Sequence, residues 1–140
     1  MSIAERLAGI RARIADAAAR AGRDAASVRL IAVSKTFPVT AVQAAYDAGQ
    51  RDFGENRVQE AVPKIEAGLA DDIRWHLIGH LQSNKAKKAA ERVHLIHSID
   101  SVDLLQRVDR AAAAAGRSLQ VLVQVDLAGE ETKHGAPPDT

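Results

Sequence analysis

Residues 30 to 36 read Leu30-Ile31-Ala32-Val33-Ser34-Lys35-Thr36, a short apolar run that ends in a lysine. A parallel strand covered by helices is apolar on both faces, as this run is. Because side chains alternate along a strand, Lys35 shares its face with Ile31 and Val33. We therefore expect Lys35 to point inward at the carboxyl end of a strand, where partial desolvation favours a nucleophilic amine. A lysine that extends to solvent is the alternative.

Similar apolar runs recur along the chain. Strands are expected to start near residues 29, 52, 73, 94 and 119, with a helical pattern in each interval. An amphipathic helix that begins with the capping-box pair Ser2 and Glu5 precedes them. The sequence therefore predicts an N-terminal helix followed by about five βα units around a parallel sheet.

Closed barrels and open doubly wound sheets both consist of such units. The sequence has neither a G-x-G-x-x-G motif nor a P-loop, which removes the main support for the nucleotide-binding open sheet. We therefore predict an α/β fold of the (β/α) TIM-barrel type. A compact barrel needs eight strands and about 250 residues, so we interpret residues 1–140 as a single, incomplete domain that holds the N-terminal part of a barrel.

Composition and charge exclude several classes of function. The net charge of +1 gives no general electrostatic support for binding nucleic acid or an anionic membrane. The chain has no cysteine, no apolar run long enough to cross a bilayer, and no secretion signal at its N-terminus. A cytoplasmic location is the expectation. The basic cluster of Lys85, Lys87 and Lys88 fits either a solvated helix face or a site for an anion.

Polar residues follow all five predicted strands, where function gathers in α/β folds. These are Ser34-Lys35, Glu55-Asn56, Gly79-His80, Asp100-Ser101 and Asp126. Asn56, Ser83 and Ser101 could instead be helix caps. We expect no metal site, because His76 and His80 lie ~13 Å apart along an extended strand. The sequence also lacks the G-x-S-x-G motif of serine hydrolases.

Four segments resemble the ordered motifs of one family. They are residues 32–36 (AVSKT), 53–60 (FGENRVQE), 75–85 (WHLIGHLQSNK) and 97–101 (HSIDS). These segments are similar to the pyridoxal 5′-phosphate (PLP) homeostasis proteins, the YggS family, and the similarity extends from about Leu30 to Gly135.

The resemblance implies a barrel like the N-terminal domain of alanine racemase. It implies that Lys35 holds PLP as an internal aldimine, and that Asn56, His80 and Lys133 bind or border the cofactor. Asp126 stands where the family more often has asparagine. The family's phosphate-binding loop and the arginine facing the pyridine nitrogen belong to the last strands, which have no counterpart in this sequence.

The leading hypothesis is a PLP-binding protein of intracellular vitamin B6 homeostasis, without robust turnover, whose partners could include apo forms of PLP-dependent enzymes. The alternative is a racemase-like enzyme that a partner chain completes. A third reading is a truncated product without function. Because Leu119 to Leu127 would form a long apolar strand at the edge of the sheet, self-association is also expected.

Overall fold

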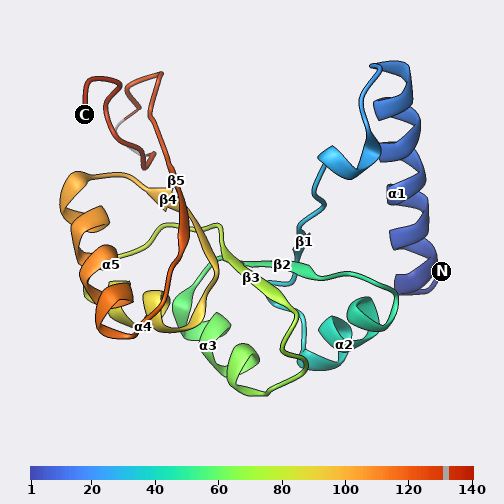
Figure 1. Ribbon diagram of the computed structural model, residues 1–140, viewed down its shortest axis with the longest axis horizontal. Coiled ribbons are helices and arrows are strands. Elements are labelled where there is room, and N and C mark those ends of the chain that lie inside the picture. Colours follow the sequence, from blue (N-terminus) through green and yellow to red (C-terminus); the bar gives the residue numbers. More distant parts are fainter. Residues whose placement is uncertain (131–132) are drawn as a thin grey trace.

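A computed structural model describes residues 1–130 and 133–140. Five strands alternate with helices along the chain (Figure 1). The strands are β1 (Ala32–Val33), β2 (Asp52–Glu55), β3 (Arg74–Leu77), β4 (Leu95–Ile99) and β5 (Gln120–Val123). The helices are α1 (Ile3–Arg20), α2 (Val39–Asp47), α3 (Val58–Glu66), α4 (Ala86–Arg92) and α5 (Val102–Ala114), with short 3-10 turns η1 (Ala25–Ser27) and η2 (Ser83–Lys85).

The five strands form one parallel sheet in the order β1-β2-β3-β4-β5. In an open doubly wound sheet the strand order reverses at a switch point, whereas consecutive order is the pattern of a barrel. Helices α2 to α5 lie along one side of the sheet, and α1 and the C-terminal segment rise at its two ends (Figure 1). The predicted α/β fold, the N-terminal part of a (β/α) barrel after a first helix, is confirmed.

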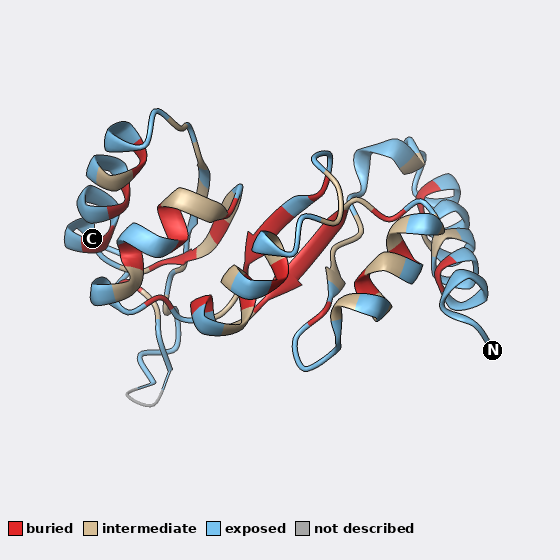
Figure 2. Cartoon of the chain, turned by 90° about the horizontal axis from the view of Figure 1, so that it is seen from below, coloured by how far each residue is buried: buried red, intermediate tan, exposed pale blue. Residues whose placement is uncertain are grey.

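The core lies between the sheet and its helices. Phe53 and Trp75 pack with ring centroids 5.8 Å apart, and Leu77 and Ile96 are fully buried beside them. Helix α4 contributes alanines, which let its backbone approach the sheet closely. The buried residues run along the strands and the sheet-facing sides of the helices (Figure 2).

The outer strands are shorter than predicted. We expected a strand from Leu30 to Thr36 and another from Leu119 to Leu127, but β1 has two residues and β5 has four. Val33 and Leu122 are exposed, because the face of the sheet opposite the helices has little to cover it at these strands. Lys35 is exposed as well, so the expected desolvation of its amine is wrong for this chain.

Two of the four predicted helix caps are confirmed. The Oγ atoms of Ser2 and Ser101 accept hydrogen bonds from Glu5 N and Leu104 N, each at 3.1 Å. The prediction for Asn56 is wrong, since the cap residue of α3 is Arg57. The prediction for Ser83 is also wrong, because Ser83 lies inside η2.

Helix α3 continues through Pro63. After β5, Val125 pairs with Ala136 in an isolated parallel bridge. In the part of the chain that the structure describes, no helix has both the length and the apolarity needed to cross a membrane.

Candidate functional site

The carboxyl ends of β1, β2 and β3 place Lys35, Asn56 and His80 along one edge. Val33 pairs with Gly54, and Ile78 N donates to Glu55 O at 2.9 Å, so the residues that follow these strands are neighbours. Gly79 packs directly on Asn56. A Cβ atom at Gly79 would lie 2.3 Å from the Asn56 carbonyl oxygen, and only glycine allows this approach.

His80 belongs to a second group at the same edge. Its Nδ1 lies 3.6 Å from Asp100 Oδ2, after β4, and its ring stacks on that of His134 with centroids 3.6 Å apart and planes 10° apart. Lys133, which precedes His134 in the chain, therefore lies next to this stack. Lys35 and Lys133 follow the two outermost strands, with three strands between them, so closure of a barrel would be needed to bring them together.

His80, Asp100 and His134 could in principle hold a metal ion, because one ligand atom of each lies within 4.8 Å of the others. An ion lies near the plane of an imidazole that binds it, and two parallel planes separated by a stacking distance cannot share such a position. Both rings would have to tilt first. The arrangement is therefore one of ring stacking, and the expectation of no metal site stays a prediction.

A shallow cavity of about 300 Å³ opens beside His80. Arg57, Gln59, Gln82 and Lys85 line it with His80, so its rim is basic. Lys87 and Lys88 are exposed on α4 and do not line it. The lysine cluster thus divides, with two members on a solvated face and Lys85 at the cavity.

Ionic side chains contact the backbone on both sides of Lys35. Glu55 was among the polar residues expected at the strand ends, whereas Glu60 and Lys64 were not predicted. Lys64 Nζ donates to Glu55 Oε1 at 2.6 Å, to Ser34 O at 2.7 Å and to Glu60 Oε2 at 3.1 Å. Ser34 Oγ donates to Glu55 Oε1 at 2.8 Å. The Glu60 and Lys64 spacing of four residues on a helix was the available signal, but such pairs are common on exposed helix faces.

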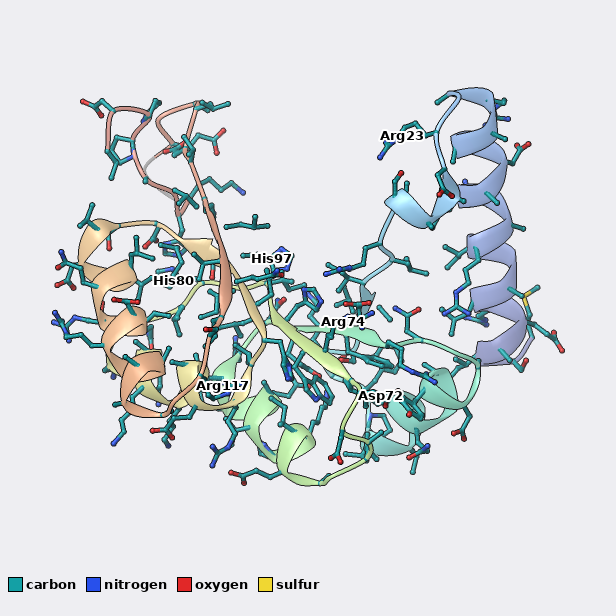
Figure 3. All side chains as sticks on the ribbon, in the orientation of Figure 1. Arg23, Asp72, Arg74, His80, His97 and Arg117 are labelled. Atoms are coloured by element: carbon teal, nitrogen blue, oxygen red, sulfur yellow. The ribbon has the colours of Figure 1, made fainter. Side chains whose placement is uncertain are left out.

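A second buried network lies on the face of the sheet opposite the helices. Asp52 accepts two hydrogen bonds from Arg74, at 2.8 and 2.7 Å, and one from His76 Nε2 at 2.9 Å. Because a carboxylate only accepts, the proton between His76 and Asp52 lies on His76 Nε2, and the Nδ1 atom of His76 lies 2.9 Å from His97 Nε2. Figure 3 shows His97 on the side of the sheet away from α3.

Electrostatics differ along this network. Burial would raise the pKa of Asp52, but the hydrogen bonds from Arg74 and His76 outweigh burial and lower it. Burial, followed by the neighbouring His76, lowers the pKa of His97. The network therefore holds a carboxylate and a neutral imidazole at opposite ends of His76.

Several solved structures are similar to this chain in sequence and fold. The PipY protein of Synechococcus elongatus without PLP is 48% identical to this chain with a TM-score of 0.86, and covers 98% of this chain and 60% of its own. The structure of PipY with PLP bound is 47% identical to this chain, with a TM-score of 0.83, and the match covers 98% of this chain and 59% of PipY. The alanine racemase of Streptomyces coelicolor is more distant, at 27% identity and a TM-score of 0.63, over 94% of this chain and 34% of the racemase.

Curated relatives agree with the structures. The pyridoxal phosphate homeostasis protein of Pseudomonas aeruginosa is 48% identical over 99% of this chain and 60% of its own length. The pyridoxal phosphate homeostasis protein of Escherichia coli K12 is 44% identical, over 95% of this chain and 58% of its own length. The chain thus spans about 60% of the length of these relatives, and the resemblance read from its motifs is confirmed. The family model for the alanine racemase N-terminal domain matches residues 6–140. The chain therefore belongs to the alanine racemase N-terminal domain family.

Proposed function

We propose that this chain binds PLP through Lys35 and takes part in cytoplasmic vitamin B6 homeostasis. The observation that carries the proposal is the position of Lys35, an exposed amine just after β1 and next to Asn56. Function in barrels of this kind is found at the carboxyl ends of the strands. The PLP-bound structure of PipY, at 47% identity, supports the choice of ligand.

The residues present fit the aldehyde end of PLP. The Lys35 amine would attack the aldehyde carbon, and the carbonyl oxygen would leave as water, so that a C=N bond joins protein and cofactor. Asn56 would border the cofactor beside Lys35, and His80 and Lys133 would do so from the stacked group once the barrel is closed. PLP supplies an aldehyde that a primary amine captures reversibly.

Peptide mapping tests the assignment of Lys35. After incubation with excess PLP, borohydride delivers hydride to the carbon of the C=N bond and fixes the pyridoxyl group on its lysine. We expect the label on Lys35 and loss of the visible chromophore in Lys35→Ala, with Lys85→Ala as the matched control. Labelling of Lys85 or Lys133 in place of Lys35, with a chromophore that survives in Lys35→Ala, would overturn the assignment. A titration without saturable binding would instead support the reading as a product without function.

The similarity to alanine racemase raises catalysis as a second candidate. Racemisation requires acid–base groups on both faces of the substrate carbanion. Among the residues that the structure describes, Lys35 is the one evident candidate at the carboxyl end of β1. Incubation with PLP and L-alanine should therefore leave the optical rotation unchanged, and a steady loss of rotation would favour an enzyme that a partner chain completes.

A further inference from the structure

Thr36, the residue after Lys35, has an unusual backbone conformation. Its φ angle is 66°, and Thr36 is the one described residue other than glycine with a positive φ. The left-handed region is unfavourable for a β-branched side chain, because Cβ crowds the backbone. Such a conformation persists only where its surroundings impose it.

The contacts that impose it come from α3. Thr36 N donates to Glu60 Oε2 at 2.5 Å, and Lys64 Nζ donates to Ser34 O at 2.7 Å. The two side chains are joined to each other at 3.1 Å. Two side chains of helix α3 therefore hydrogen-bond to the backbone on both sides of Lys35, while the side chain of Lys35 itself is exposed.

Glu55 fixes this arrangement from below. The side chains of Lys64 and Glu55 are 8% and 1% exposed, and their ion pair measures 2.6 Å. Buried ion pairs are costly to desolvate and are weak evidence for stability. In addition, Glu55 Oε2 is buried and has no hydrogen-bond partner among the described residues. Apolar side chains at these two positions would pack without a cost of desolvation. The charges of Glu55 and Lys64 therefore call for an explanation other than stability.

We infer that Glu55, Glu60 and Lys64 are positioning residues that hold the backbone around Lys35 in the one conformation from which its amine meets an aldehyde. The inference rests on the proposed role of Lys35 and extends it. The Thr36 N–H and Lys64, in that order, lower the pKa of Glu60, so Glu60 stays an acceptor at neutral pH. Without Glu60, Thr36 would relax to a negative φ and turn the Lys35 side chain away.

Two variants at Glu60 and one matched control test the inference. Glu60→Ala removes the acceptor for Thr36 N–H, Glu60→Gln keeps an acceptor oxygen, and Glu66→Ala removes a carboxylate of the same helix that pairs with Arg92. The first readout is the share of the pyridoxyl label on Lys35 relative to Lys85 and Lys133 of the same molecule. The second is the hydrogen-exchange rate of the Thr36 amide without PLP.

We expect Glu60→Ala to lower the Lys35 share and to speed Thr36 exchange by about tenfold each, the factor for one hydrogen bond to a charged group. Glu60→Gln should retain most of the share, and Glu66→Ala should change neither readout. Faster exchange with an unchanged share would overturn the inference. If Lys35 of the wild type takes no label, the proposed function is wrong. The exchange rate of the Thr36 amide in Glu60→Ala still tests whether Glu60 holds the Thr36 backbone.

A variant that only unfolds would lose labelling for another reason. Thr36→Gly in the Glu60→Ala background addresses this, because glycine adopts a positive φ without strain. We expect the double variant to regain part of the Lys35 share. A double variant no better than Glu60→Ala, with the fold intact by circular dichroism, would show that the turn at Thr36 does not orient Lys35.

Discussion

Asp52 shows how much a single residue can hold on the inner face of the sheet. Besides Arg74 and His76, Arg29 approaches it to 3.9 Å. Asp52 is itself buried, so its charge is stabilised by these partners and not by water. Its location at the start of β2, opposite the edge that carries Lys35, gives it a structural role.

Replacing this carboxylate tests that role. Asp52→Asn should lower the free energy of unfolding at pH 7 by about 2 kcal/mol, because the amide cannot satisfy Arg74 and His76 together. Urea unfolding followed by the fluorescence of the single tryptophan, Trp75, measures it. Asp16→Asn, which removes an exposed pair with Arg20, is the control and should cost about 0.5 kcal/mol or less. Equal effects would contradict the role of burial.

The same variant tests how the free energy of unfolding depends on pH. Since the folded pKa of Asp52 is lowered, its contribution to stability is present above the unfolded value of about 3.9 and is lost as the pH falls toward the folded pKa. Wild type should therefore lose more stability than Asp52→Asn between pH 5 and 3. Parallel losses would assign the acid sensitivity to other carboxylates.

Sequence reasoning reached some residues of the site and not others. Lys35 and Asn56 were predicted as site residues because strand ends can be read from local pattern, and the pairing of Val33 with Gly54 brings the ends of these two strands side by side. Glu60 and Lys64 were missed because their partners, Thr36 and Ser34, lie 24 and 30 residues away. His134 was missed for the same reason, since its stacking on His80 joins two loops.

At the scale of elements, the repeat of strand and helix was predictable, whereas the ends of the elements were less so. Alternating apolar runs depend on local sequence, but where a strand stops depends on what covers it. Val33 and Val123 lie at such ends and are exposed. The caps illustrate the same limit, because Asn56, Ser83 and Ser101 look alike in sequence and only Ser101 caps its helix.

The two serines provide a matched comparison. Ser101→Ala should lower the free energy of unfolding by about 1 kcal/mol, since Leu104 N loses its acceptor. Ser83→Ala should change it by less than about 0.5 kcal/mol, because Ser83 is exposed and makes no side-chain hydrogen bond in the described part of the chain. Urea unfolding of both variants measures these changes. A larger loss of unfolding free energy in Ser83→Ala than in Ser101→Ala would contradict the assignment of Ser101 as the cap.

For the whole molecule, the important feature is a sheet with two open edges. Within the described residues, β1 and β5 each have one strand neighbour, apart from the bridge between Val125 and Ala136. Exposed apolar side chains gather at and beyond β5; they are Leu122, Val123, Val125 and Leu127. Unpaired strand edges and apolar patches of this kind recruit other chains.

We therefore predict that the 140-residue chain self-associates through β5, because this edge has no second strand neighbour among the described residues and its apolar side chains are exposed. Sedimentation velocity should show species larger than 14.9 kDa that grow with concentration. Val123→Glu should shift the distribution toward monomer, because a charge on an edge strand opposes pairing. Val102→Glu is the matched control, since Val102 on α5 is 54% exposed and Val123 is 58% exposed. A stable monomer whose sedimentation Val123→Glu leaves unchanged would contradict this prediction.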